Sequence, residues 1–372
     1  MRPAPDTVID IDGHVLLEAA PGWLDYFEPS DARALEAQLL ENRRHWYSRE
    51  GLDRDGLTAS IRERVKAGGA GGWDPKERLR VMDSEGIDCV VLFPTEIGLK
   101  LDAYSPSVCR GYNRWLADYC ATERDRLFGV ALLPLDDATA AADELERCVR
   151  EHGFVGFFMK NSVNGRMCDA DHYDTLYARA EALDVPLLMH IPSQLKDLVE
   201  DNFGYNFLRS HVLHPVSEML SVMDVIYGGL LDRFRKLRVG FMEGQVGWLP
   251  WFMARLDDQL ETYGGRPGLD PGIAKSPSAY LDDGRLFFSC DTDERYLAFA
   301  ANAQLTPATR GDSCIVWGSD YPHSDCTFPK ALETLRAQPG LLEDQSRLIT
   351  GANPQRLLFG EFDGKAEAPH GP

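Results

Sequence analysis

The sequence predicts an α/β protein built as a single (β/α)8 TIM-type barrel, with long insertions after the first and fifth strands. Three observations support this fold. Eight short apolar runs recur along the chain, helical patterns separate them, and no G-x-G-x-x-G motif follows the first run. Repeated strand and helix units imply a parallel sheet, and eight of them favour a closed barrel over an open sheet that binds dinucleotides.

The expected strands are apolar, β-branched runs, which suit strands buried on both faces of a sheet. The helical stretch before the second run shows the connecting pattern. Pro75 can open a helix, Leu79 and Met82 fall near a 3.6-residue period, and Gly86 helps to end it. The expected strands cover residues 8–12, 88–93, 128–133, 155–160, 186–190, 237–243, 286–290 and 313–318.

Residues 1–362 are expected to form one domain, because a chain of 372 residues lies within the range of a single barrel with insertions. The stretch 15–73 is expected to be an insertion or lid, and 191–217 a long loop, since long insertions on a barrel tend to carry function or contacts. The polar end, 363–372, is expected to be a flexible tail. Trp46 and Tyr47 in the first insertion would suit a homodimer contact.

The composition narrows the classes of partner. The formal net charge is −20 and the sequence pI is near 4.8, so neither nucleic acid nor an anionic membrane surface is expected as a partner. The eight cysteines form no C-x-x-C pair, and the first twelve residues lack a signal-peptide pattern. A cytoplasmic protein with reduced, buried thiols and no membrane span is therefore expected.

Polar residues of metal-ligand type stand where the expected strands end. Barrel enzymes place their sites at the carboxyl ends of the strands. These residues are Asp12 and His14 at the first strand, His190 at the fifth, Glu243 at the sixth and Asp320 after the eighth. Strand residues two apart point the same way, so Asp12 and His14 can enter the barrel mouth together. Imidazole and carboxylate groups together bind a divalent ion and leave a position open for water or substrate.

Five motifs along the chain carry a family resemblance. They are IDIDGH at 9–14, HVLHP at 211–215, GQVGWLP at 244–250, GSDYPH at 318–323 and NPQRL at 353–357. With them the chain resembles the amidohydrolase superfamily, in the branch that includes aminocarboxymuconate semialdehyde decarboxylase. The resemblance spans nearly the whole chain. It implies a barrel enzyme with no organic cofactor and with one divalent metal held by Asp12, His14, His190 and Asp320.

Two residues depart from the common pattern of this branch. The family commonly begins its first motif with H-x-H or E-x-H, so Asp12 is a shorter ligand. Many decarboxylases of the branch carry a proton-handling histidine at the end of strand six, where this chain has Glu243. In a partly dehydrated barrel mouth Glu243 could act as a general acid or base, or it could orient a metal ligand from behind.

Two further sets of residues complete the expected site. Catalytic proton transfer is expected from Asp320, Glu243, His214 and His211. Substrate binding is expected from His323, Trp248 and Arg43. Histidine titrates near neutral pH, and a guanidinium swung over the barrel mouth from the first insertion would hold a carboxylate by two hydrogen bonds.

Three functions are compatible with these residues. The resemblance most directly implies non-oxidative decarboxylation of a small aromatic or unsaturated carboxylic acid. The second is hydrolysis of a C–N, C–O or C–C bond by metal-activated water, for which the same ligands serve. The third is a non-catalytic barrel that binds a ligand. Zinc is the favoured metal, with manganese as the alternative because two of the four ligands are carboxylates.

Overall fold

The computed structural model describes residues 3–4, 6–47, 69–95, 105–190, 212–323 and 326–360. Within these ranges eight parallel strands form one sheet, and each of the eight expected runs overlaps one of them. The strands follow the order β1 (Ile9–Val15), β2 (Cys89–Pro94), β3 (Leu127–Ala131), β4 (Gly156–Met159), β7 (Leu187–Met189), β8 (Val239–Phe241), β9 (Leu286–Cys290) and β10 (Ile315–Trp317). The predicted barrel class is confirmed.

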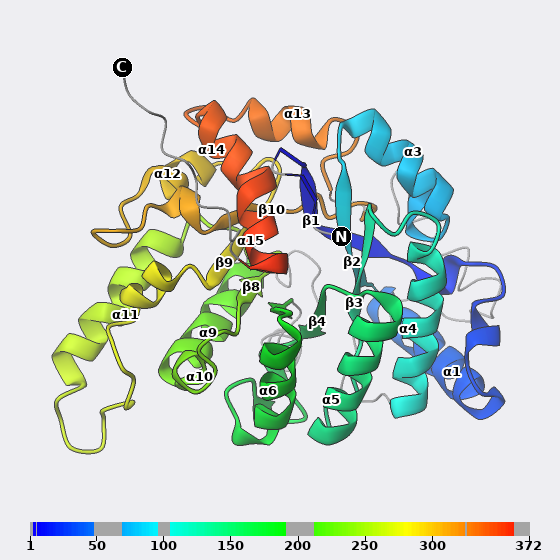
Figure 1. The fold of residues 1–372 in the computed structure, drawn as a ribbon, viewed down its shortest axis with the longest axis horizontal. Helices are drawn as coiled ribbons and strands as arrows, with labels where there is room; N and C mark the ends of the chain where they lie inside the picture. Colours follow the sequence, from blue (N-terminus) through cyan, green and yellow to red (C-terminus); the bar gives the residue numbers. More distant parts are fainter. Residues whose placement is uncertain are drawn as a thin grey trace.

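The segment after β10 returns to β1 and brings the two ends of the sheet together. The Asp320 N–H donates to the Asp12 carbonyl, and the His14 N–H donates to the Tyr321 carbonyl, both at 2.8 Å. Gly318 is required at this junction, because a Cβ there would lie 2.4 Å from the Cβ of Asp12. The first and last strands are therefore neighbours, as Figure 1 shows around the centre of the ring.

Helices connect the strands and form the outer ring of the molecule (Figure 1). The helix α3 begins as predicted, because Asp74 accepts the Lys76 N–H at 2.9 Å, Pro75 follows, and Gly86 ends it with φ of 74°. The other connecting helices are α4 (Pro106–Cys120), α5 (Ala138–Arg147), α6 (Asp174–Leu183), α9 (His214–Tyr227), α10 (Leu230–Arg233), α11 (Leu249–Tyr263), α12 (Leu297–Asn302), α13 (Ala331–Arg336), α14 (Glu343–Arg347) and α15 (Asn353–Phe359). Helix α3, described above, spans Pro75–Glu85.

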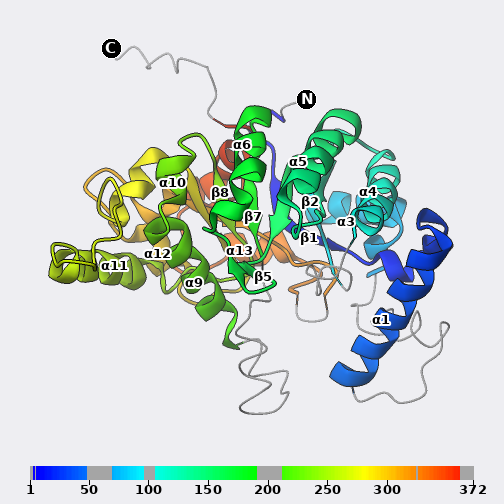
Figure 2. The same cartoon turned by 90° about the horizontal axis from the view of Figure 1, so that it is seen from below.

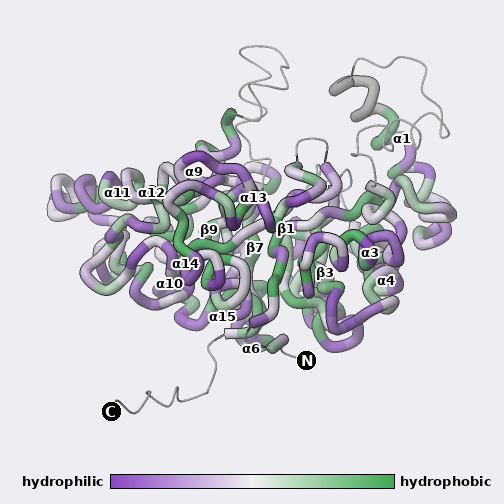
Figure 3. Tube along the Cα trace, turned by 90° about the horizontal axis from the view of Figure 1, so that it is seen from above, coloured by the Kyte–Doolittle hydropathy of each residue, from purple (hydrophilic) through white to green (hydrophobic). Residues whose placement is uncertain are grey.

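The core lies between the strands and the inner faces of these helices. Every residue of β1, β2 and β9 is buried, as expected for parallel strands that are covered on both faces. Figure 3 shows the same division, with hydrophobic strands inside and hydrophilic stretches on the outer helices. The polar residues Asp10, Asp12 and His14 break the apolar pattern of β1 while remaining buried. A buried polar group requires partners, so this strand points to a site.

The first insertion contains helix α1 (Pro29–Tyr47), which extends beside the barrel in Figure 2. The side chains of residues 41–47 lie outside the described part, as do residues 48–68 and 191–211, so the predicted lid and dimer contact stay predictions. The loop predicted over 191–217 ends earlier than expected, because helix α9 already begins at His214. All eight cysteines are buried, as expected. Among the described helices, none is long and apolar enough to cross a membrane.

Candidate active site

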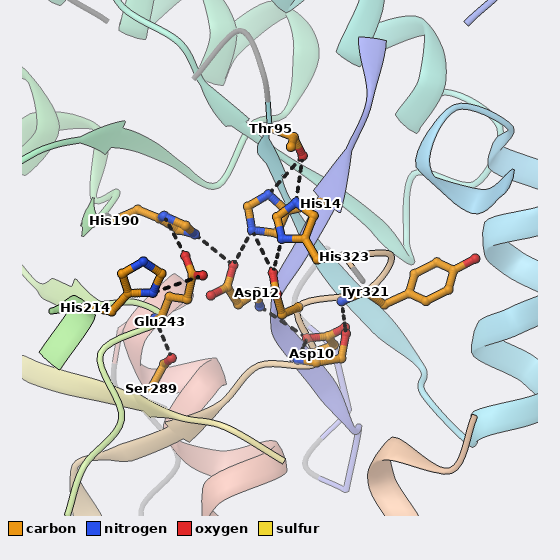
Figure 4. A network of polar contacts seen from close by, with 12 residues as sticks. Asp10, Asp12, His14, Thr95, His190, His214, Glu243, Ser289, Tyr321 and His323 are labelled. Carbon is orange, nitrogen blue, oxygen red and sulfur yellow. Dashed lines mark hydrogen bonds and ion pairs between the residues drawn. The ribbon is translucent and has the colours of Figure 1, made fainter. Parts of the chain in front are cut away.

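Asp12, His14 and His190 form a buried group at the barrel mouth (Figure 4). One ligand atom from each lies within 4.8 Å of the others. Asp12 Oδ1 lies 3.4 Å from His14 Nε2 and 3.3 Å from His190 Nε2. The predicted convergence of strand one and strand five is therefore present. A second group within the same distance limit joins His14 to Asp320 and His323.

The backbone around Gly13 directs both predicted ligands of β1, Asp12 and His14, toward the same place. The pairing register with β2 shifts between Asp10 and Gly13, so the strand is irregular there. A Cβ on Gly13 would lie 2.5 Å from Val90 Cγ2, which leaves glycine as the residue that fits against β2.

The electrostatics of this group suit a cation. Burial, aided by the neighbouring His323, lowers the pKa of His14 to about 3, so its imidazole is neutral at neutral pH. Burial alone would raise the pKa of Asp12, but the adjacent histidines hold it below its usual range. Within the described residues His14 Nε2 makes no hydrogen bond, although Thr95 Oγ1 lies 3.4 Å from Nδ1. A buried ring nitrogen that makes no hydrogen bond and lies beside a carboxylate fits a metal ligand.

Asp320 and His323 form a close acid–histidine pair beside this group. Asp320 Oδ1 lies 2.6 Å from His323 Nδ1 and 3.3 Å from His14 Nε2. The His323 ring stacks on His14 with centroids 4.1 Å apart, and its Nε2 lies 3.1 Å from Thr95 Oγ1. Asp320 has φ of 55°, an uncommon backbone conformation for a non-glycine residue. The structure thus pairs His323, predicted to bind substrate, with a predicted ligand and proton carrier.

Glu243 occupies the other side of the group. Its carboxylate oxygens lie 3.6 Å from His190 Nδ1 and 3.6 Å from His214 Nδ1. Glu243 has φ of 58°, and its N–H donates to Ser289 Oγ at 3.0 Å. The side chain therefore faces both a predicted ligand and a predicted proton carrier, as Figure 4 shows.

Asp10 connects β1, which carries the predicted ligands Asp12 and His14, to the segment after β10, which carries Asp320. Its Oδ1 accepts the N–H of Asp12 at 3.2 Å and that of Ser319 at 2.8 Å. Its Oδ2 accepts the Ser319 hydroxyl at 2.6 Å. Burial raises the pKa of Asp10 to about 6, although these hydrogen bonds oppose the rise. Asp10 is therefore a positioning residue that joins segments far apart in the sequence.

Arg78 braces the same junction from helix α3. Its side chain is 1% exposed and donates to the carbonyls of Gly71 at 3.1 Å, Tyr321 at 3.2 Å, and His14. The sequence contained a signal for this residue, because Arg78 stands one helical turn before the apolar Met82 and so falls on the buried face. Sequence reasoning missed Arg78, Asp10 and Thr95 as parts of the site.

A cavity of about 460 Å³ opens beside the ligand group. Three predicted residues line it: His214, Glu243 and Asp320. Trp248 instead closes the turn after β8, because its indole N–H donates to the Gly244 carbonyl at 2.7 Å, and it is not among the described lining residues. His211 and the Arg43 side chain lie outside the described residues.

Comparison with known proteins identifies the family of this chain. A family model described as Amidohydrolase matches residues 9–360. The chain is 33% identical to Decarboxylase orsB of Emericella nidulans over 68% of this chain and 77% of that protein. It is 25% identical to 2-amino-3-carboxymuconate-6-semialdehyde decarboxylase of Dictyostelium discoideum over 77% of this chain and 75% of that protein.

A solved structure shares the fold. The 5-carboxyvanillate decarboxylase of Novosphingobium aromaticivorans, complexed with manganese and 4-hydroxy-3-methoxy-5-nitrobenzoic acid, superposes with a TM-score of 0.68. The match covers 95% of this chain and 96% of that chain at 18% sequence identity, which supports the fold alone. Because the family model and the first of these relatives both span most of the chain, the protein belongs to the amidohydrolase family, in the branch that contains these decarboxylases.

Proposed function

We propose that the chain catalyses metal-dependent, non-oxidative decarboxylation of a small aromatic or unsaturated carboxylic acid. One observation carries this proposal: the buried Asp12, His14 and His190 group lies directly beside the Asp320–His323 pair, and Asp320 lines the wall of a cavity. The decarboxylase names of the relatives support the same reaction class. The substrate's carboxylate would face the ligand group, with its ring or unsaturated chain in the cavity.

Asp12, His14, His190 and Asp320 would hold the metal. A bound divalent ion supplies Lewis-acid stabilisation for negative charge that develops on the substrate and a point of attachment for its oxygens. The mixed nitrogen and oxygen ligands favour zinc on chemical grounds, with manganese as the alternative. Manganese gains support from the carboxyvanillate decarboxylase structure, whose complex contains it.

Asp320 and His323 would supply the proton. In the proposed reaction a C–H bond forms at the carbon that bears the carboxylate, and the bond from that carbon to the carboxylate breaks. CO2 leaves without the bonding electrons, which remain on the substrate, so the reaction needs no redox partner. Because Asp320 Oδ1 and His323 Nδ1 lie 2.6 Å apart, His323 would share the proton that Asp320 delivers and would then replace it.

Glu243 would orient the site rather than deliver the proton. Its separations of 3.6 Å from His190 and His214 are longer than hydrogen bonds, so it acts on both through its charge. A carboxylate behind a ligand histidine fixes the orientation of the ring and raises its basicity. His214 lines the cavity, so it would contact the substrate there.

Assays that detect CO2 separately from hydrolysis products test the proposal. The metal content of the purified protein is measured first, and the protein loaded with zinc or manganese is then offered a panel of benzoic and unsaturated acids. Release of CO2 with one equivalent of metal is expected. Turnover to hydrolysis products alone would support the hydrolase alternative, whereas a protein that binds neither metal would support the non-catalytic barrel.

A further inference from the structure

Two acidic residues after β9 form part of the cavity wall beyond the ligand group. Asp291 and Asp293 both line the 460 Å³ cavity, together with Gln245 from the segment after β8. Asp291 is half-buried and Asp293 is exposed. None of the described lining residues is a lysine or an arginine. This part of the wall therefore presents hydrogen-bond acceptors and negative charge.

The two loops that carry these residues are fixed to each other. Gln245 Nε2 donates to Asp291 Oδ2 at 2.9 Å. Glu294 Oε1 accepts the N–H groups of Val246 at 2.8 Å and Gly247 at 2.6 Å. Gln245 itself has φ of 57°, a conformation that such bracing maintains. The Asp291 side chain is thus held in place by Gln245, and Asp293 stands on the same braced loop.

The three acidic residues of the loop after β9 point in different directions. Glu294 is 6% exposed, and its carboxylate is directed at the backbone of the neighbouring loop. Asp291 and Asp293 instead face the cavity. An ionised carboxylate only accepts hydrogen bonds, so its fitting partners are hydroxyl, amino and ammonium groups. A second carboxylate on a ligand would meet like charge and would lose its hydration without gaining a donor.

We propose that Asp291 and Asp293 select the substrate by the end remote from its reacting carboxylate. They accept hydrogen bonds from hydroxyl or amino substituents and exclude acids that carry a second carboxylate. This inference rests on the proposed function for the identity of the ligand as a substrate. The specificity arises through both attraction and repulsion, which together discriminate more strongly than either alone.

Binding of matched ligand pairs tests the inference without turnover. Calorimetry on the metal-loaded protein compares 3-hydroxybenzoate with isophthalate and 4-hydroxybenzoate with terephthalate, at low and high salt. We expect the hydroxybenzoate of each pair to bind at least about tenfold more tightly at low salt. Added salt should narrow the difference, because screening weakens repulsion at a partly exposed wall.

The variant D291N/D293N separates this wall from the rest of the site. It should bind the dicarboxylates at least about threefold more tightly than the wild type, a gain that misfolding does not produce. The matched control is D143N, which removes one charge from the outer helix α5 and should leave both affinities unchanged. Equal affinity within each wild-type pair, or an unchanged preference in D291N/D293N, overturns the inference. If the preference is present but no acid releases CO2, the proposed function fails, while the selection of ligands by Asp291 and Asp293 stands.

Discussion

The half of the barrel mouth formed by β1 and β10 and the half formed by β8 and β9 each carry an acid–histidine pair. In the first half Asp320 lies 2.6 Å from His323, and in the second Glu243 lies 3.6 Å from His214. Both acids have left-handed backbones, with φ of 55° and 58°. Such conformations cost on the order of 1–3 kcal/mol each and persist only where the surrounding structure imposes them.

Each half also has a buried carboxylate that imposes its geometry. Asp10 accepts two backbone N–H groups in the first half, including that of Ser319, next to the left-handed Asp320. Glu294 accepts those of Val246 and Gly247 in the second. Burial raises the pKa of Asp10 to about 6 and that of Glu294 to about 7. The same device, a buried acid that holds the backbone of the neighbouring strand's loop, therefore occurs twice.

The difference between the halves lies in what each pair contacts. Asp320 and His323 are in contact with the candidate ligand His14, Asp320 by a 3.3 Å separation and His323 by ring stacking. Glu243 reaches the ligand His190 only at 3.6 Å. The tight pair is thus suited to proton transfer at the reacting carbon, and the loose pair to orienting ligands and substrate.

His190 links the two halves, so its removal should have the largest effect. His190→Ala takes away a neighbour of Asp12 at 3.3 Å and of Glu243 at 3.6 Å. We expect loss of the bound metal and a fall in CO2 release of more than about a thousandfold. Elemental analysis and circular dichroism check the result. The control His172→Ala removes a histidine that contacts only the Leu135 carbonyl among the described polar contacts and should retain the metal.

Substitution of the two acids tests their difference directly. Asp320→Asn should lower kcat by about a thousandfold, because general acid catalysis contributes about 10²–10⁴ and the amide cannot deliver the proton. Glu243→Gln should lower kcat only about tenfold, since it retains a polar side chain behind His190. Both are measured at saturating metal, with bound metal quantified. A greater loss in Glu243→Gln than in Asp320→Asn would reverse the assignment of the proton carrier.

The strands and the convergence of the candidate metal ligands were predictable because they depend on local pattern. Buried apolar runs identified all eight strands, and the two-residue spacing of Asp12 and His14 placed both in the mouth. Strand ends were less accurate. The run 237–243 contains a strand of only three residues, Val239–Phe241, because the chain turns to give Glu243 its left-handed backbone.

The contacts between distant segments were not predictable. Thr95 lies near both His14 and His323, and the last contact joins residues 228 positions apart. Asp10 reaches Ser319 across 309 positions. Such contacts follow from closure of the barrel and from the exact rise of each strand, which hydrophobic periodicity does not contain. A sequence-based analysis finds residues at strand ends but not which of them pair.

Asp10, the buried carboxylate of the first half, should control metal affinity. Asp10→Asn keeps one acceptor but replaces the oxygen that accepts the Ser319 hydroxyl, so the segments of Asp12 and Asp320 lose a shared support. We expect metal affinity to fall about 10–100-fold with the fold retained. Competition with a chelator measures the affinity. Asp88→Asn is the matched control, because Asp88 accepts the Val8 N–H at 2.8 Å near the opposite end of β1 and should leave affinity unchanged.

Glu294, the buried carboxylate of the second half, should make the free energy of unfolding depend on pH. This is the smallest of the expected effects. Burial raises the pKa of Glu294 from 4.5 to about 7, so the folded chain holds a proton that the unfolded chain releases between these values. The contribution of this proton to the free energy of unfolding is present at pH 4.5 and below and is lost as pH rises toward 7. Above pH 7 the wild type carries the cost of a buried charge, on the order of 3 kcal/mol.

Glu294→Gln removes this titration while keeping an acceptor for Val246 and Gly247. The difference in unfolding free energy, variant minus wild type, should therefore rise between pH 5 and pH 8, as measured by denaturant titration of the metal-free chains. Glu261→Gln on the exposed side of α11 is the control, and its difference should stay flat. A flat difference for Glu294→Gln as well would mean that its carboxylate is ionised in the folded chain at pH 5. Glu294 would then be an ionised hydrogen-bond acceptor. The two halves would share the geometry of their buried carboxylates but not the raised pKa.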